Sequence, residues 1–177
     1  MDPETAGGIR LLCLDVDGVM TDGRIVYDEH GVESKRFHVR DGLAIKLWRE
    51  AGHEIAIISS RSSEAVTRRA AELGIDHVHQ GCHDKSAALE AVCLATGIEP
   101  RHAAAMGDDL PDLPVLHAVG LPIAVADAAV EVRHAAATVT SAPGGHGAVR
   151  EAVEHILQAQ GRWDDLLLRW QTAPQEG

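Results

Sequence analysis

The chain has 177 residues, of which 45% are hydrophobic and only 3% are aromatic. This length fits one domain whose core is built from Ala, Val, Leu and Ile. Its 27 acidic and 16 basic residues give a formal net charge of -11, which argues against binding to nucleic acid or to an anionic membrane surface. An anionic substrate therefore needs a local basic site or a metal ion.

Cysteine usage and the N-terminal residues indicate the compartment. Cys13, Cys82 and Cys93 match no zinc-binding spacing and are too few for a disulfide framework, so we expect reduced thiols. The N-terminal sequence lacks the basic and apolar regions of a signal peptide, and no apolar run reaches the length of a membrane span. These features predict a cytoplasmic protein without a membrane anchor.

Short apolar runs alternate along the chain with longer segments of helical periodicity. We expect strands at Arg10–Leu14, Glu54–Ser59, His77–Val78, Ala103–Met106, Leu121–Val125 and Thr138–Val139. We expect helices at Leu43–Ala51, Glu64–Leu73, Lys85–Ala95, Pro111–His117 and Ala148–Ala159. This order is typical of parallel strands joined by crossover helices. The predicted fold is therefore α/β, with a Rossmann-like, doubly wound, mostly parallel sheet flanked by helices.

Residues 24–37 interrupt this alternation. The sequence RIVYDEHGVESKRF favours two short strands around a turn at Asp28–Gly31, which predicts a β-hairpin insertion. The short interval between Asp15 and Ser59 leaves no room for a separate cap domain. Residues 162–177 are predicted to be a short amphipathic segment with a polar tail that frays or docks on a partner. We expect residues 1–177 to form a single domain.

Acidic residues follow two of the predicted strands. Asp15 and Asp17 come directly after the apolar run LLCL, and GDDLPD, residues 107–112, follows AAAM. In an open α/β sheet, ligands bind beyond the carboxyl ends of the strands, so we expect these acids to face one crevice. Carboxylates from two strand ends suit Mg²⁺, and the predicted metal site lies between Asp15 and Asp108.

This arrangement favours phosphoryl transfer. A carboxylate beside Mg²⁺ can attack phosphorus to form an aspartyl phosphate, and Asp17 can then act as general acid and base. Ser59, at the end of a strand, and Lys85, at the start of a helix, are placed to donate hydrogen bonds to the phosphoryl oxygens. The sequence therefore predicts a phosphatase.

Each feature has a simpler interpretation when it is taken alone. An Asp-x-Asp pair after a strand is commonly a turn with solvated acids, and a single Ser or Lys is commonly a surface residue. His77, His79 and His83 invite a zinc site, but no Cys or acid accompanies them at a zinc-binding spacing. The conjunction of Asp-x-Asp, Ser, Lys and Gly-Asp-Asp in this order favours the phosphatase.

The ordered set resembles the haloacid dehalogenase superfamily, whose phosphatases carry these motifs in the same order. The resemblance implies that Asp15 is the nucleophile and Asp17 the general acid and base, and that Ser59 and Lys85 clamp the phosphate. The implied Mg²⁺ ligands are Asp15, the backbone carbonyl of Asp17, and Asp108, with Asp109 and Asp112 in support.

Longer segments resemble the capless sugar-acid phosphatases of this superfamily, from about Ile9 to Gly161. The segments are LDVDGVMTDGRIVYDEHG, RFHVRDGLAIKLW, AIISSRSS, GIDHVHQGCHDK, MGDDLPDLPVL, GLPIAVADA and GGHGAVREAVEHIL. The resemblance implies 3-deoxy-D-manno-octulosonate 8-phosphate as the substrate, as in lipopolysaccharide precursor synthesis. Two alternatives remain, which are a phosphatase of a nine-carbon ulosonate 9-phosphate of the sialic acid type and a noncatalytic scaffold or regulatory domain.

Arginine side chains are the expected contacts to the sugar acid, because a guanidinium fork matches a carboxylate. The predicted substrate contacts are Arg40, Asp41, Ser60 and Arg61, and the resemblance also implies a place near the site for Arg150. The loop GGHG, residues 144–147, either approaches a ligand or connects a strand to a helix.

In the resembling family a homotetramer completes the pocket, which implies a tetramer here. The apolar hairpin strand IVY and the segment that contains Trp163 and Trp170 suit subunit contacts. The alternative is that both tryptophans cover the core of their own domain.

Overall fold

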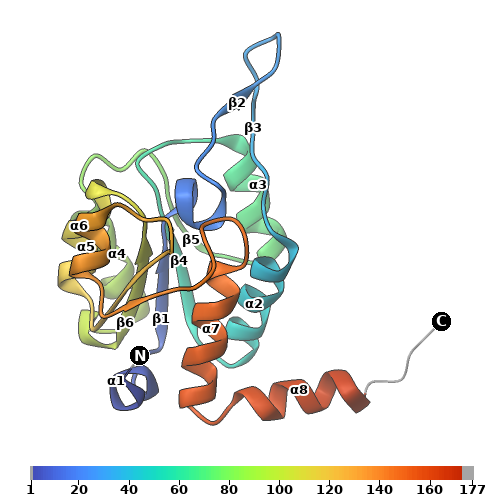
Figure 1. Cartoon of the computed structure of the whole chain (residues 1–177), viewed down its shortest axis with the longest axis vertical. Coiled ribbons are helices and arrows are strands. Elements are labelled where there is room, and N and C mark those ends of the chain that lie inside the picture. The colour runs from blue at the N-terminus through green and yellow to red at the C-terminus, as the bar shows by residue number, and fades with distance from the viewer. Residues whose placement is uncertain (1, 173–177) are drawn as a thin grey trace.

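The computed structural model describes residues 2–172, and its centre is a six-stranded parallel sheet between two layers of helices (Figure 1). The strand order is β5-β4-β1-β6-β7-β8, and every neighbouring pair is parallel. The strands are β1 (Leu11–Leu14), β4 (Glu54–Ile58), β5 (His77–His79), β6 (Ala103–Gly107), β7 (Leu121–Ala124) and β8 (Thr138–Val139). The predicted doubly wound α/β fold is confirmed.

Helices cover both faces of the sheet. The α-helices within residues 2–172 are α1 (Pro3–Gly7), α2 (Val39–Glu50), α3 (Glu64–Leu73), α4 (Lys85–Thr96), α5 (Leu113–Ala118), α6 (Val130–Ala135), α7 (Ala148–Ala159) and α8 (Trp163–Thr172). In one layer α2 packs against α7, and in the other α5 packs against α4 and α6 (Figure 1). Within residues 2–172, no helix has both the length and the apolar character that a membrane span requires.

The strands and helices lie where the sequence predicts them to within two residues, with one exception. Helix α2 begins at Val39, four residues before the predicted Leu43. Its first turn contains the buried Asp41, whose Oδ1 accepts a hydrogen bond of 2.8 Å from the Arg150 amide. The short helices α1 and α6 have no predicted counterpart, since neither contains enough residues for a helical period.

The central strand β1 delivers the first acidic motif to the edge of the sheet. It lies between β4 and β6, and all four of its side chains are buried because helices cover both faces. Its apolar run ends at Asp15, where the chain turns. From β1 the chain adds β4 and β5 on one side, and it then returns to build β6, β7 and β8 on the other. The loops after β1 and β6 therefore border the crevice where strand order reverses.

The predicted hairpin is present and projects beyond the carboxyl ends of the sheet strands (Figure 1). Its strands, β2 (Val26–Tyr27) and β3 (Glu33–Ser34), are shorter than the sequence suggests. Asp28 closes the turn, because its carboxylate accepts hydrogen bonds from the amides of His30 and Val32 at 2.9 and 2.8 Å. The apolar side chains on the first arm of the hairpin are exposed.

The two tryptophans near the C-terminus have different environments. Trp163 is only 5% exposed, and the Arg150 guanidinium lies 4.7 Å from the centre of its ring. Trp163 thus covers the core of its own domain, whereas Trp170 is 64% exposed on α8. The predicted polar tail, residues 173–177, lies outside the described residues.

The glycine-rich loop before α7 packs against the loop after β1. A β-carbon at Gly144 would lie 1.7 Å from the carbonyl oxygen of Gly18, and one at Gly145 would lie 2.5 Å from the amide nitrogen of Asp22. This backbone contact favours the connecting role of GGHG. The loop connects β8 to α7 and braces the loop that carries the first acidic motif.

Replacing Gly144 by Ala is expected to lower the free energy of unfolding by about 1–3 kcal/mol, because the new β-carbon forces the two loops apart. Chemical denaturation of both proteins measures the difference. Gly7→Ala is the matched control, since nothing lies within 4 Å of its added β-carbon and Ala favours helix α1. Equal effects of the two substitutions would contradict the close contact between the loops.

Candidate active site

A pocket of about 280 Å³ opens at the carboxyl ends of the central strands. Its lining residues are Asp15, Asp17, Gly23, Ser59, Ser60, Arg61, Lys85, Asp108, Asp109, Pro111 and Asp112. Nine of the predicted site residues are among them. Arg40, another predicted contact, is exposed on the first turn of α2 and is not part of the lining. Four separate sequence motifs therefore meet at one place.

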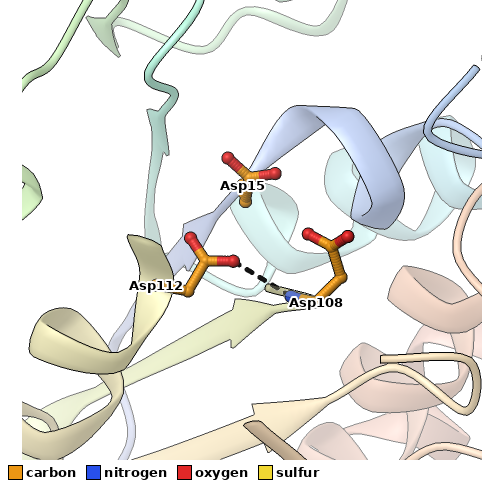
Figure 2. A group of neighbouring side chains, drawn as sticks. All are labelled: Asp15, Asp108 and Asp112. Carbon is orange, nitrogen blue, oxygen red and sulfur yellow. Dashed lines mark hydrogen bonds between the residues drawn. The ribbon is translucent and has the colours of Figure 1, made fainter. Parts of the chain in front are cut away.

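Three carboxylates converge in this pocket (Figure 2). Each of Asp15, Asp108 and Asp112 offers an oxygen atom, and these atoms all lie within 4.8 Å of one another. Asp112 Oδ2 also accepts hydrogen bonds from the amides of Asp108 at 3.0 Å and Asp109 at 3.3 Å. The sequence predicts only a supporting place for Asp112, whereas the structure brings its carboxylate into the centre of the cluster.

Lys85 neutralises part of this charge. Its Nζ donates hydrogen bonds to Asp15 Oδ1 and to Asp112 Oδ1, each at 2.6 Å, and the side chain is buried. The preceding Asp84 fixes the start of α4, because its carboxylate accepts a hydrogen bond of 2.9 Å from the Ser86 amide. Burial alone lowers the pKa of Lys85, but the two carboxylates outweigh it and raise that pKa overall. The ammonium therefore stays charged.

One ammonium does not balance three acids. Burial, followed by repulsion from Asp112, raises the pKa of Asp15 to about 7 despite the opposing effect of Lys85. Burial, followed by repulsion from Asp15, likewise raises the pKa of Asp108 to about 7. The single charge of Lys85 therefore does not neutralise the cluster, and a bound cation would lower the pKa values of both Asp15 and Asp108.

The donor set fits a hard divalent cation such as Mg²⁺, which prefers oxygen ligands. Both oxygens of Asp112 are already engaged, by Lys85 and by backbone amides. Within residues 2–172, the Asp108 carboxylate has neither a hydrogen bond nor an ion pair, and Lys85 binds Asp15 through Oδ1. Asp15 and Asp108 are therefore the carboxylates free to bind a metal ion, with Asp112 holding their surroundings in place.

Gly18 allows the approach of the two loops. It has a φ of 102°, a value that favours glycine, and a β-carbon here would lie 2.0 Å from Asp108 Oδ2. The loop after β1 therefore passes directly over the Asp108 carboxylate. No larger residue fits at this position without moving the acid.

The Asp17 side chain points to a different set of partners. Its Oδ1 accepts a hydrogen bond from Lys35 Nζ, and its Oδ2 lies 3.7 Å from Arg61 Nε. Lys35 comes from the hairpin, as does Glu33, which pairs with both Lys35 and Arg61. Neither residue is among those predicted from the sequence. Charged residues on a hairpin strand are ordinarily solvated, so the sequence contains no signal that separates these two from surface residues.

The segment after β4 supplies hydrogen-bond donors. Ser59 is buried, and its Oγ accepts a hydrogen bond of 3.3 Å from the Arg61 amide, so the hydroxyl proton remains available to an acceptor in the pocket. Ser60 and Arg61 are exposed at the rim.

Two residues predicted near the substrate have structural contacts instead. Arg150 lies over Trp163 and forms a 3.1 Å ion pair with Glu154, and it does not line the pocket. Asp41 is buried against the start of α7, where it accepts the Arg150 amide hydrogen bond. Within their own chain both residues therefore join helices and do not line the crevice.

The pocket as a whole suits phosphoryl transfer. A carboxylate positioned by an ammonium, a second acid two residues on, a buried hydroxyl and a metal-binding edge are the parts that nucleophilic attack on a phosphate ester requires.

Comparison with known proteins gives the same assignment. Residues 78–151 match the family model of haloacid dehalogenase-like hydrolases. The chain is 45% identical to 3-deoxy-D-manno-octulosonate 8-phosphate phosphatase of Escherichia coli K12 over 160 residues, which cover 90% of this chain and 85% of the relative.

Solved structures agree with this match. The phosphatase of the same name from Moraxella catarrhalis, in complex with magnesium, phosphate and KDO, has a TM-score of 0.93 and 43% identity, and the match covers 96% of this chain and 97% of that one. A cobalt-bound counterpart from Haemophilus influenzae has a TM-score of 0.88 and 42% identity, over 90% and 93% of the two chains. The chain belongs to the haloacid dehalogenase-like hydrolases, within the family of the 3-deoxy-D-manno-octulosonate 8-phosphate phosphatases.

Proposed function

We propose that this chain is a Mg²⁺-dependent phosphatase that hydrolyses 3-deoxy-D-manno-octulosonate 8-phosphate. The observation that supports it most is the Asp15 carboxylate, which Lys85 holds at 2.6 Å beside the free carboxylate of Asp108. The names and the bound ligands of the similar proteins support the substrate and the metal ion. A noncatalytic scaffold has no need to keep these groups in one pocket.

In the first step, Asp15 attacks the phosphorus atom. A bond forms between an Asp15 oxygen and phosphorus while the bond from phosphorus to the sugar oxygen breaks. Asp17 gives its proton to that departing oxygen, so the product leaves as a neutral alcohol. The chain then holds an aspartyl phosphate at Asp15.

In the second step, water releases the phosphate. Asp17, now ionised, takes a proton from the water while its oxygen bonds to phosphorus, and the bond to Asp15 breaks. Inorganic phosphate leaves, and both acids regain their starting states. The Ser59 hydroxyl and Lys85 donate hydrogen bonds to the non-bridging oxygens.

Asp15, the backbone carbonyl of Asp17 and Asp108 would hold the metal ion, with Asp109 and Asp112 in support. When bound, Mg²⁺ supplies charge that stabilises the phosphoryl group and keeps Asp15 ionised as a nucleophile. Asp109 assists by capping the turn that carries Asp112, since its Oδ1 accepts a hydrogen bond of 2.8 Å from the Leu110 amide.

Residues at the rim of the pocket select the sugar-acid substrate. Arg61 is the best-placed candidate to bind the substrate carboxylate, beside Ser60, because it lines the pocket and offers a planar fork of donors. Arg40 lies outside the pocket of its own chain, so its contact with substrate remains a prediction. The nine-carbon ulosonate 9-phosphate carries the same carboxylate and stays the alternative substrate.

We also propose a homotetramer. On the hairpin, Ile25, Val26 and Tyr27 form an exposed apolar strip, and Trp170 is exposed on α8. Side chains of this kind suit subunit contacts. A capless pocket needs such a neighbour to exclude water from the reaction.

Phosphate release from a panel of sugar phosphates, with and without Mg²⁺, tests the activity. We expect release concentrated on the eight-carbon ulosonate phosphate, and a loss of more than about 10³-fold in Asp15→Asn, which removes the nucleophile. Asp165→Asn, at an exposed position on α8, is the matched control and should retain wild-type activity. Preference for a nine-carbon substrate would replace the substrate assignment, and no release from any compound would contradict the phosphatase.

The metal-free protein is expected to lose stability as pH rises from about 4 to about 7. The folded-state pKa of Asp108 is about 7, above its ordinary value of 3.8, so the folded state holds the proton longer and ionisation favours unfolding across this range. Mg²⁺ should therefore raise the melting temperature more at pH 8 than at pH 5.

Thermal denaturation of wild type and Asp108→Asn, in chelator and in Mg²⁺, measures both effects. The substitution should raise the melting temperature in chelator at pH 8, and it should remove most of the Mg²⁺ shift. A Mg²⁺ shift that is equal in both proteins would show that Asp108 does not bind the metal ion.

Val26→Asp is expected to dissociate the tetramer, because it places a charge in the apolar strip of the hairpin. Light scattering should give four times the chain mass for wild type and a smaller mass for the variant. Leu94→Asp is the matched control, since Leu94 is an exposed apolar residue on α4 away from the hairpin. A wild-type monomer that is active and selective would rule out the tetramer.

A further inference from the structure

A closed ring of charges joins the hairpin to Asp17. Lys35, which directly follows β3, pairs with Asp17 Oδ1, and its Nζ lies 2.8 Å from Glu33 Oε1. Arg61 closes the ring, because its Nη2 donates a hydrogen bond of 2.6 Å to Glu33 Oε2 and its Nε lies 3.7 Å from Asp17 Oδ2. Two acids and two cations thus alternate, so each charge has a partner of opposite sign on both sides.

Lys35 forms its ion pair with Asp17 through a buried side chain. The Lys35 side chain is only 1% exposed, although it comes from a hairpin that projects from the domain. An ammonium is withdrawn from water only where nearby acids offset the loss of hydration. Glu33 and Asp17 supply that offset, and Lys35 therefore stays attached to Asp17.

The two oxygens of Asp17 differ in a way that matters for proton transfer. Oδ1 is held by Lys35, whereas Oδ2 is buried and, within residues 2–172, has no hydrogen-bond partner. A buried acceptor without a partner costs free energy, and its presence calls for a functional reason. An oxygen that is fixed in place and accepts no hydrogen bond is what a general acid and base needs to exchange a proton with substrate and water.

We propose that Lys35, anchored by Glu33, is a positioning residue for Asp17, which fixes Oδ1 so that Oδ2 remains free to exchange the proton. The proposal rests on the proposed function, because it assumes that Asp17 acts as general acid and base.

Lys35 and Arg61 have different roles in this arrangement. The Arg61 side chain is 41% exposed and lines the pocket, so substrate can reach it. Lys35 does not line the pocket, whereas Asp17 does, and the Lys35 side chain is only 1% exposed. Lys35 therefore acts through Asp17 and not through contact with substrate.

The ring also makes the hairpin part of the acid-base machinery. Lys35 and Asp17 are 18 residues apart in the chain, and the whole hairpin lies between them. A shift of the second hairpin arm would carry the Lys35 amine with it and turn the Asp17 carboxylate. Contacts made by the hairpin are thereby coupled to proton transfer.

The test compares Lys35→Met with Lys46→Met, which removes an exposed lysine on α2. We expect Lys35→Met to lower kcat on the ulosonate phosphate by about 10²-fold, the scale of a misplaced catalytic group, with KM changed by less than about twofold. Lys35→Arg, which keeps the charge, should recover part of the loss. Lys46→Met should match wild type.

A double-mutant cycle separates positioning from substrate contact. In an Asp17→Asn background, Lys35→Met should cause no further loss, because both substitutions act on the same carboxylate. With p-nitrophenyl phosphate, whose leaving group departs without a proton, kcat/KM of Lys35→Met should stay close to wild type. A further loss in the Asp17→Asn background, or a raised KM alone, would overturn the proposal in favour of a substrate contact.

A crystal structure of Lys35→Met gives a readout that is independent of turnover. The Asp17 carboxylate should leave its wild-type orientation, and an unchanged orientation would overturn the positioning role even if activity fell. Failure of the proposed function has a different signature, because wild type itself would then release no phosphate from any substrate.

Discussion

The Lys85 ammonium between Asp15 and Asp112 is the interaction on which the site depends. Three carboxylates within 4.8 Å of one another repel strongly in a buried setting, and Lys85 is the cation that makes their approach tolerable. Removing one partner of a buried ion pair typically costs about 3–5 kcal/mol, because the remaining charge is left without compensation. The same lysine ties helix α4 to the loops after β1 and β6. The partial neutralisation leaves negative charge at Asp15 and Asp108, where a divalent cation completes the balance.

The two acids of the first motif each receive a buried lysine, and the two lysines come from different parts of the fold. Lys85 reaches Asp15 from the start of a helix in the body of the domain, whereas Lys35 reaches Asp17 from the hairpin. Each ammonium also binds a second acid, Asp112 or Glu33. The proposed nucleophile, Asp15, is thus held from the body of the domain, and the proposed proton-transferring group, Asp17, is held from the hairpin. One backbone turn of three residues therefore presents two carboxylates, each held by a different lysine.

Much of this site follows from local sequence order, and the remainder depends on long-range contacts. The positions of Asp15, Ser59, Lys85 and Asp108 follow from the parallel sheet, because each lies at the end of a strand or the start of a helix and the topology brings such ends together. The central place of Asp112 and the burial of Lys35 are not visible in the sequence. Each depends on partners distant in the chain, and an isolated charged residue in a turn or hairpin is most often solvated.

The same distinction explains the extent of the helices. The helices α3 and α7 have the predicted bounds, because apolar residues recur at helical spacing in their sequences and form one buried face. Helix α2 starts earlier than its apolar pattern suggests, and its first turn contains the buried Asp41, whose Oδ1 accepts a hydrogen bond from an amide more than one hundred residues away. Arg150 was predicted near the substrate from its motif, yet its guanidinium packs on Trp163. Motif order locates backbone positions well, but it does not determine the direction of a long side chain.

The place of β1 at the centre of the sheet has a consequence for how the protein matures. One neighbour, β4, follows after about forty residues, but the other, β6, begins only at Ala103. During synthesis the strand that carries Asp15 therefore stays half paired until more than half of the chain has left the ribosome. Contacts between such distant segments are slow to form, and an unpaired apolar strand is prone to aggregation. A topology that places strands on both sides of β1 thus leaves one edge of that strand exposed until β6 has been synthesised.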